Sequence, residues 1–366
     1  MTADSRTDEK WMQRALELAK RGEGLTRPNP PVGALVVKGN RVLGEGYHRK
    51  AGGPHAEIHA LRQAGERARD GTLYITLEPC STQGKTPPCT QAILDAGVRR
   101  VVVGAIDPNP NHTGRGLRIL QRGGLDVVTG IGGEEANNLI APFSVWIAER
   151  RPFVTLKLAM TVDGCIADRD GHSRWISGPA ARAHTQALRR MADAVMVGRG
   201  TVASDNPSLW PRPARGRHPY RVVVDSRARL PLASQVLNDA HRRHTIVAVT
   251  HTAPANKVAA LQSKGVQVFR TAARRGRVSM KSLMRRLGKE GVLHVLCEGG
   301  GELAEALMRD GLVDRYEIFI APAILGDTRA VRAISGKGWK LKNMPLLWFQ
   351  NVERIGPDLL IHAIPK

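Results

Sequence analysis

The sequence predicts a two-domain protein of the α/β class, and three observations carry this prediction. A chain of 366 residues is too long for one ordinary core, so two domains of roughly 150 to 200 residues are expected. Short β-branched runs alternate with helical patterns throughout, which is typical of a largely parallel or mixed sheet. The pattern restarts after Arg150-Arg151-Pro152. We therefore place one domain at residues 1–148 and a second at residues 149–366.

The first domain opens with a helix whose apolar face contains Trp11, Ala15, Leu18 and Ala19. A hairpin follows, because Gly39-Asn40 separates two apolar runs. In chain order we expect strands at 34–37 and 42–46, a helix at 56–68, a strand at 72–77, a helix at 90–96 and a strand at 101–105.

Strands and helices also alternate in the second domain. Its sequence contains no repeat of the length found in solenoid proteins. Its expected strands lie at 153–158, 194–197, 221–224, 245–249, 266–269, 293–297 and 317–320.

The chain is strongly basic, with a formal net charge of +22 at pH 7 that falls mostly after residue 150. A basic half suits an anionic partner such as a phosphorylated substrate, a dinucleotide or nucleic acid. Within it, one basic cluster is better explained as a loop and the solvated face of a helix. Its members are Arg270, Arg274, Arg275, Arg277, Lys281, Arg285, Arg286 and Lys289.

Location follows from what the sequence lacks. No apolar stretch approaches the roughly 18 residues of a membrane-spanning helix. The polar segment Met1 to Lys10 has no apolar core of a secretory signal. Four cysteines are too few for a disulfide scaffold. We expect a cytoplasmic enzyme without a membrane partner.

Four residues of the first domain form a zinc pattern. His55 and Glu57 open a helix, Cys80 follows a strand, and Cys89 stands just before another helix. One imidazole and two thiolates leave a tetrahedral position for water, as in catalytic zinc sites. Zinc lowers the pKa of that water, so that hydroxide is available to attack at neutral pH. Glu57 lies beside the metal without needing to bind it, so we expect it to be the catalytic proton shuttle.

The cysteine spacing departs from the general pattern of nucleobase deaminases, His-x-Glu with Pro-Cys-x-x-Cys. Here eight residues separate Cys80 from Cys89. The insert contains a glycine turn, two prolines and one cation, Lys85, which could hold a substrate phosphate.

At these residues the chain resembles the bifunctional deaminase-reductase family of riboflavin biosynthesis, in which the long cysteine gap is usual. The shared motifs are Pro28-Asn29-Pro30-Pro31-Val32-Gly33, Gly44-Glu45-Gly46-Tyr47-His48, Gly53-Pro54-His55-Ala56-Glu57, Thr76-Leu77-Glu78-Pro79-Cys80, Gly84-Lys85-Thr86-Pro87-Pro88-Cys89, Asp107-Pro108-Asn109-Pro110 and Gly114-Arg115-Gly116.

The resemblance implies a cytidine-deaminase-like αβα sandwich with a mixed sheet in the first domain. It further implies that Asn29, His48 and Lys85 hold the aminopyrimidine and its sugar phosphate. Thr82 departs from the family, which usually has histidine at that position.

Two glycine-rich turns follow strands in the second domain. Gly198–Ala203 imitates a dinucleotide fingerprint, with Asp225 at a strand end further on. Glu298–Gly301 precedes a helix whose N-terminus could bind a pyrophosphate. Each turn alone is equally compatible with a generic strand-to-helix connection. A Rossmann domain usually opens with its fingerprint, whereas a strand precedes this one, so we expect a different nucleotide fold.

The second domain resembles the dihydrofolate-reductase-like α/β domain of the same family almost to its end. The markers are Leu156-Lys157-Leu158-Ala159, Asp163-Gly164, Ser173-Arg174-Trp175-Ile176-Ser177, Asp205-Asn206-Pro207, Asp225-Ser226, Glu298-Gly299-Gly300 and Gly356-Pro357-Asp358.

This second resemblance implies binding sites for NADPH and for substrate. The NADPH contacts would be Ala159, Trp175, Thr201, Asp205, Ser226, Gly300 and Gly301. The substrate contacts would be Lys157, Ser173, Arg189, Leu209, Arg212 and Glu298. Ser226 beside Arg227 suits the 2′-phosphate of NADPH, although Asp225 alone would favour NADH. The resemblance decides for NADPH.

The implied activity has two steps on one small phosphorylated pyrimidine. Zinc-dependent hydrolysis removes an amino group from 2,5-diamino-6-(5-phosphoribosylamino)pyrimidin-4-one. NADPH then reduces ribosyl to ribityl, giving 5-amino-6-(5-phosphoribitylamino)uracil. The resemblance also implies a homo-oligomer.

Two other interpretations remain open. One is a zinc deaminase acting on a base in nucleic acid, with a basic accessory domain. The low aromatic content of 4% and the long cysteine gap speak against it. The other is a binding or regulatory protein without catalysis, which the intact zinc pattern disfavours.

Overall fold

The computed structural model describes residues 3–82, 88–214 and 218–366. It divides into two compact units, Met1–Arg150 and Arg151–Lys366. Each unit has its own sheet and its own core, and each is described separately below. No helix within the described ranges is both long and apolar enough to cross a membrane.

The first unit is built on a five-stranded mixed sheet with the strand order β2-β1-β3-β4-β5. Strand β1 is antiparallel to β2 and β3, whereas β3, β4 and β5 are parallel. The elements are α1 (Ala3–Lys20), β1 (Gly33–Lys38), β2 (Arg41–Tyr47), α2 (Ala56–Ala64), β3 (Thr72–Leu77), α3 (Cys89–Asp95), β4 (Arg100–Ala105), α4 (Arg115–Arg122), β5 (Asp126–Thr129) and α5 (Gly133–Glu149).

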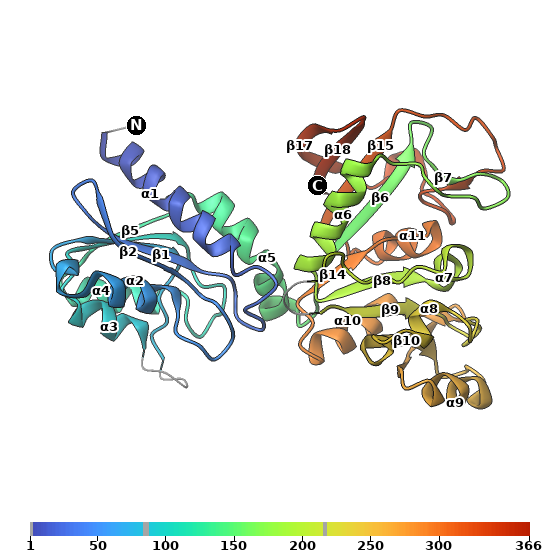
Figure 1. Cartoon of the computed structure of the whole chain (residues 1–366), viewed down its shortest axis with the longest axis horizontal. Helices are drawn as coiled ribbons and strands as arrows, with labels where there is room; N and C mark the ends of the chain where they lie inside the picture. The colour runs from blue at the N-terminus through green and yellow to red at the C-terminus, as the bar shows by residue number, and fades with distance from the viewer. Residues whose placement is uncertain (1–2, 83–87, 215–217) are drawn as a thin grey trace. The chain divides into compact units, whose positions relative to one another are not determined.

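Helices cover both faces of this sheet (Figure 1). On one face α2, α3 and α4 pack on the side chains that alternate along the strands, such as Val36, Ile75 and Val103. On the other face α1 and α5 pack on the intervening residues, such as Leu35 and Val102. The alternation of a strand thus supplies two cores from one sheet. The αβα sandwich with a mixed sheet is confirmed.

The second unit contains a nine-stranded sheet with the order β11-β10-β9-β8-β14-β6-β15-β18-β17. Its first seven strands are parallel, and β18 and β17 complete it antiparallel. The strands of this sheet are β6 (Phe153–Thr161), β8 (Ala194–Gly198), β9 (Tyr220–Val224), β10 (Thr245–Thr250), β11 (Gln267–Thr271), β14 (His294–Cys297), β15 (Arg315–Ala321), β17 (Leu347–Ile355) and β18 (Asp358–Pro365).

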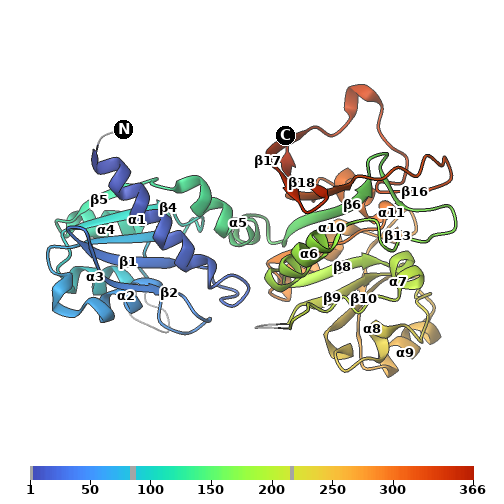
Figure 2. The same cartoon turned by 45° about the horizontal axis from the view of Figure 1, so that its top comes forward.

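Helices again cover both faces of the larger sheet (Figure 2). One core lies under α10 and α11, and separate clusters lie under the helices of the opposite face. The helices are α6 (Pro179–Met191), α7 (Arg199–Asp205), α8 (Gln235–Asn238), α9 (Ala255–Ser263), α10 (Met280–Lys289) and α11 (Gly301–Arg309). Two short strand pairs complete the described part of the unit, β7 (Cys165–Ala167) with β16 (Val331–Arg332) and β12 (Ala273–Arg274) with β13 (Arg277–Val278).

Several element boundaries differ from the sequence-based prediction. The helix predicted at 56–68 ends at Ala64 and continues as a 3₁₀ turn at Gly65–Ala68. The helix predicted at 90–96 begins at Cys89, so that cysteine is helical rather than just outside. The strand predicted at 266–269 lies at Gln267–Thr271. The two C-terminal strands, β17 and β18, were not predicted. The compact units divide after Arg150, close to the predicted boundary.

A fully buried arginine gives the first testable expectation. Arg221 is 0% exposed and makes two bonds to Asp239, at 2.6 and 2.8 Å. In the Asp239→Asn variant this charge stays buried without its partner, which costs about 3–5 kcal/mol of the free energy of unfolding. Urea unfolding of the second unit measures it. Glu302→Gln removes the exposed partner of Arg277 and should change that free energy by less than about 1 kcal/mol. Equal losses in both variants would contradict the assignment.

The pH dependence of stability follows from Glu317 of β15. Burial alone would raise the pKa of Glu317, but hydrogen bonds from His184 and His362 lower it. The bond to Glu317 in turn raises the pKa of His362. The contribution of protonated His362 to the free energy of unfolding is complete below its ordinary pKa of 6.5, and it is lost as pH rises through the raised pKa. The carboxylate's contribution is complete above its ordinary pKa of 4.5 and is lost as pH falls through the lowered value.

The contact is therefore strongest between these two ordinary values. We expect His362→Gln to lower the free energy of unfolding more at about pH 5.5 than at about pH 8.5, measured by urea titration. The exposed His251→Gln serves as the control. A pH-independent difference for His362→Gln would show that the contact is not ionic.

Candidate active sites

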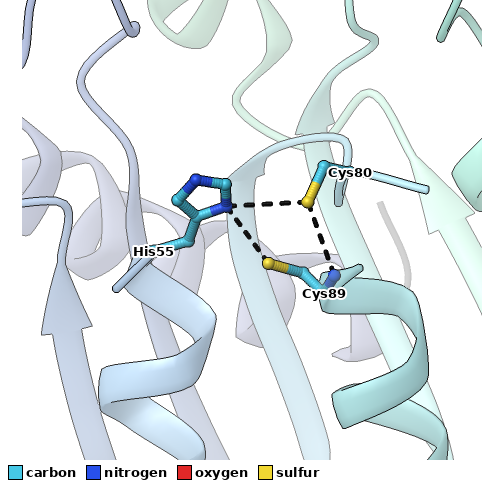
Figure 3. A group of neighbouring side chains, drawn as sticks. All are labelled: His55, Cys80 and Cys89. Carbon is cyan, nitrogen blue, oxygen red and sulfur yellow. Dashed lines mark hydrogen bonds between the residues drawn. The ribbon is translucent and has the colours of Figure 1, made fainter. Parts of the chain in front are cut away.

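Three metal-ligating side chains of the first unit meet at one point (Figure 3). The Nδ1 atom of His55 lies 3.1 Å from the Sγ of Cys89 and 3.6 Å from the Sγ of Cys80. All three ligand atoms lie within 4.8 Å of one another. One imidazole nitrogen and two thiolates at these separations fit a single zinc ion with one position left for a reactant.

Local structure places each ligand at an element end. His55 is the residue before α2, Cys80 follows β3 after Glu78-Pro79, and Cys89 is the first residue of α3. The Cys89 amide donates to the Cys80 Sγ at 3.4 Å. Hydrogen bonds from the Cys89 thiol and from His55 hold the pKa of Cys80 well below its usual range. The thiolate form, which is the form that binds metal, is thereby favoured.

Glu57 occupies the second position of α2 and is 2% exposed. One of its carboxylate oxygens, Oε2, is buried without a hydrogen-bond partner. Burial raises the pKa of Glu57. A buried carboxyl group beside the ligands, with one oxygen that has no hydrogen-bond partner among the described residues, is suited to carry a proton.

A chain of hydrogen bonds fixes His48 beside the ligands. Its Nδ1 lies 3.1 Å from the carbonyl oxygen of Pro54, and its Nε2 lies 3.1 Å from the Asn29 amide. Burial lowers the pKa of His48, so a neutral ring donates to Pro54 and accepts from Asn29. The His48 ring packs edge-on to His55, with 5.2 Å between centroids. Two predicted substrate contacts thus stand together next to a metal ligand.

Glu78 is a residue whose role the motif alone did not reveal. Its carboxylate accepts from the amides of Asp107, at 3.2 Å, of Gly114, at 2.9 Å, and of Gly116, at 2.9 Å. These bonds fasten the loop before α4 to the end of β3. A Cβ at Gly116 would lie 2.3 Å from the Pro79 oxygen, so only glycine fits there. The nearby Asp-Pro-Asn-Pro and Gly-Arg-Gly motifs were the available signal.

The remaining predicted contact of the first unit is Lys85, which lies outside the described residues. Thr82, where the resemblance calls for histidine, is the last described residue before that gap.

The second unit has a large cavity of about 2040 Å³. Every residue of this unit predicted to contact cofactor or substrate lines it: Lys157, Ala159, Ser173, Trp175, Arg189, Thr201, Asp205, Leu209, Arg212, Ser226, Glu298, Gly300 and Gly301. They come from five strand ends and from helices on both faces of the sheet, so only the fold brings them together.

Three charged side chains with little exposure, Lys157, Arg189 and Glu298, lie together in the lining of this cavity. Arg189 donates to Glu298 twice, at 2.5 and 2.8 Å, and both side chains are nearly inaccessible. Burial opposes ionisation of Glu298, but the Arg189 charge holds the pKa of Glu298 low. Burial lowers the pKa of Lys157, which the Glu298 charge partly offsets. The guanidinium of Arg189 is therefore occupied by Glu298, and Arg212, which is exposed, keeps its own free for an anion.

The glycine turns and nearby hydroxyls suit a nucleotide. The Gly300 amide donates to the Thr201 hydroxyl at 3.4 Å, joining the two glycine-rich turns. A Cβ at Gly301 would lie 2.6 Å from the Arg332 oxygen, which explains that glycine by packing. No atom would contact a Cβ at Gly299, so a ligand can approach this backbone closely.

The Asp225 carboxylate is hydrogen-bonded within its own turn. It accepts from the Leu230 amide at 2.6 Å, and Asp225 is 3% exposed. Asp225, Ser226 and the exposed Arg227 all line the cavity. The acid that would have favoured NADH is engaged by the Leu230 amide, and the site fits NADPH.

Two family models match the chain. Residues 5–105 match the cytidine and deoxycytidylate deaminase zinc-binding region, and residues 152–361 match the RibD C-terminal domain. The riboflavin biosynthesis protein RibD of Aquifex aeolicus is 39% identical over 356 residues, which are 97% of each chain. The chain belongs to the RibD family.

Solved RibD structures share the fold over the whole chain. That of Acinetobacter baumannii has a TM-score of 0.87 at 36% identity and covers 99% of both chains. A Thermotoga maritima protein described as a diaminohydroxyphosphoribosylaminopyrimidine deaminase and 5-amino-6-(5-phosphoribosylamino)uracil reductase has a TM-score of 0.86 at 35% identity. It covers 99% of this chain and 100% of that one.

Family membership confirms the bifunctional prediction. The chain is a deaminase and reductase of riboflavin biosynthesis, with zinc as the cofactor of the first unit and NADPH as that of the second. The dihydrofolate-reductase-like fold of the second unit is also confirmed. The nucleic-acid deaminase is not supported.

The Glu78 contacts predict a local stabilising role. Glu78→Ala leaves three backbone amides of the 107–116 loop without their acceptor, which we expect to cost about 2–4 kcal/mol of unfolding free energy in the first unit. Chemical denaturation followed through the first unit measures this loss. Glu66→Ala, an exposed acid of the same unit, should leave stability nearly unchanged. NADPH oxidation by the second unit should persist in both variants, and its loss in Glu78→Ala would contradict a local role.

Proposed function

We propose that the first unit deaminates 2,5-diamino-6-(5-phosphoribosylamino)pyrimidin-4-one and that the second reduces the ribosyl group of the product. The final product is 5-amino-6-(5-phosphoribitylamino)uracil. The observation that carries the proposal is the convergence of His55, Cys80 and Cys89 beside the buried, unpartnered carboxyl oxygen of Glu57. The cavity of the second unit, lined by all of its predicted contacts, supports the second step.

In the deamination step, His55, Cys80 and Cys89 would hold zinc, which supplies an activated water. Glu57 would pass one proton from the attacking water to the ring nitrogen and then a second, from the hydroxyl group of the adduct, to the amino group that leaves as ammonia. Its burial suits this exchange, because burial brings the pKa of a carboxyl group up toward neutrality. Asn29 would orient the pyrimidine through its remaining amide hydrogen and oxygen, His48 would hold that amide in place and pack against the ring, and Lys85 would pair with the phosphate.

In the reduction step, NADPH supplies the hydride that reaches C1′ of the sugar. Lys157 and Glu298 would bind the sugar hydroxyls, and Arg189 would keep Glu298 ionised and in place. Arg212 would bind the phosphate. Ser173, which donates to Asp205 at 3.0 Å, and Leu209 would complete the substrate surface.

At the cofactor end, Thr201, Gly300 and Gly301 would position the pyrophosphate at the start of α11. Ser226 would contact the 2′-phosphate. Ala159 and the exposed Trp175 would flank the nicotinamide, and Asp205 would contact the cofactor from α7.

We also propose that the protein is a cytoplasmic homo-oligomer in which a second copy covers β17. This strand is the free edge of the nine-stranded sheet. Trp348, Phe349 and Val352 on it are 63%, 57% and 51% exposed. An apolar edge strand is a ready template for pairing with an identical strand.

The reaction assignment predicts separable activities. Glu57→Gln should lower ammonia release by at least about a hundredfold, because general acid–base catalysis contributes 10²–10⁴-fold. NADPH oxidation with the deaminated substrate should be unchanged. Zinc content by elemental analysis should stay near one per chain in Glu57→Gln and fall in Cys89→Ala. Loss of both activities in Glu57→Gln would argue against two independent sites.

The oligomer proposal predicts a change of mass in solution. Light scattering should give a multiple of the chain mass for the wild type and the monomer mass for Trp348→Glu combined with Val352→Glu. Ile324→Glu provides the control, because Ile324 is 72% exposed and lies outside β17. This variant should keep the wild-type mass. A wild-type monomer at about 10 µM, or dissociation of the control alone, would refute an interface through β17.

A further inference from the structure

A second, smaller cavity lies outside both active sites, in a groove between the edge strand β11 and helix α10. Its volume is about 490 Å³. The residues that line it are Arg270, Thr271, Ala272, Ser279, Lys281, Ser282, Arg285, Arg286 and Lys289. Five are cations, three carry hydroxyl groups, and none is acidic. None of them lines the large cavity of the same unit.

Three of these cations form a row along one face of α10. Lys281, Arg285 and Lys289 are spaced four residues apart, so the helical rise separates neighbours by about 6 Å and the ends by about 12 Å. All three are exposed. Within the described part of the chain, no carboxylate lies within ion-pair distance of any of them.

Three other cations of the same basic cluster are balanced. Arg274 pairs with Asp310, and Arg277 pairs with Glu302. Arg286 pairs with Glu290 at 3.0 Å and stacks over Phe269. Within the described part of the chain, the cluster's cations that have no ion pair thus lie in the groove, apart from Arg275, which lines the large cavity.

This arrangement disfavours the helix unless an anion is present. Like charges four residues apart destabilise a helix by a few tenths of a kcal/mol for each pair. Lys281 stands in the first turn, where the helix dipole disfavours a positive charge. A bound anion would relieve both effects at once. The Ser282 hydroxyl, which accepts from the Ala272 amide at 3.4 Å, has its hydrogen to donate to such an anion.

We propose that this groove binds a chain of phosphate groups, as in tripolyphosphate or the phosphate tail of a nucleoside triphosphate. A row of cations about 12 Å long matches several linked phosphates better than a single one. None of the lining residues is aromatic, and the nearby Phe269 lies under Arg286, so no ring is offered to stack on a base. Recognition therefore rests on the phosphates, and the base contributes nothing.

The test uses the full chain, loaded with zinc and saturated with NADPH so that the large cavity is filled. Titration calorimetry at low ionic strength measures the affinity for tripolyphosphate. In the variant Lys281→Gln, Arg285→Gln, Lys289→Gln we expect at least a tenfold weaker affinity. Glutamine keeps the helix propensity of these exposed positions, and both enzyme activities should stay at wild-type level.

The matched control removes the same charge elsewhere in the unit. Lys337, Lys340 and Lys342 are exposed and line neither cavity. Their replacement by glutamine should leave tripolyphosphate affinity within twofold of wild type. A nucleoside triphosphate should bind as tightly as tripolyphosphate.

Four outcomes would overturn the proposal. They are the absence of saturable binding to the wild type, equal weakening in the two triple variants, binding of the nucleoside triphosphate without binding of tripolyphosphate, and much tighter binding of a single-stranded oligonucleotide. The last would assign the groove to nucleic acid instead. None of these outcomes depends on the two enzyme activities.

Discussion

A charged group that leaves water needs an opposite charge at short range, and this constraint shapes both halves of the protein. In the second unit it joins Arg189 to Glu298 and places Lys157 beside them. That balance lets three ionisable groups face the large cavity without destabilising the elements that carry them. In the first unit the same constraint acts in reverse. Two cysteines and a buried glutamate gather beside His55, and zinc supplies a compensating positive charge.

The zinc site was predictable from sequence because its signal is local. His55 and Glu57 are two residues apart, and each cysteine stands at an element end. The αβα layers followed from periodicity. What the sequence could not supply was the contribution of residues that act through the backbone. Nothing in the sequence around Glu78 indicates that its carboxylate binds the backbone of a loop that begins almost 30 residues later. That contact exists only when β3 and β4 lie side by side.

The reductase cavity was less accessible to sequence reasoning, for a topological reason. Its lining runs from Lys157 to Ser335, and neighbours in space are far apart along the chain. The resemblance to a family placed these residues, whereas spacing did not. Asp225 shows how a local pattern misleads. An acid at a strand end suggests a ribose ligand, but the Asp225 carboxylate accepts a hydrogen bond from the Leu230 amide in the turn that follows. The basic cluster after residue 270, interpreted from sequence as a solvated face, contains both balanced and unbalanced charges once the fold is seen.

The position of β6 in the middle of the large sheet has a consequence for how the chain is made. This strand leaves the ribosome directly after the first unit, yet it pairs with β14 and β15, whose residues follow some 140 positions later. Every strand pairing of the first unit, by contrast, closes within its own 150 residues. Since domains fold largely as they emerge, the deaminase half can be complete and hold its metal while the reductase half still waits for its central strands. The order of synthesis thus matches the order of the two reactions.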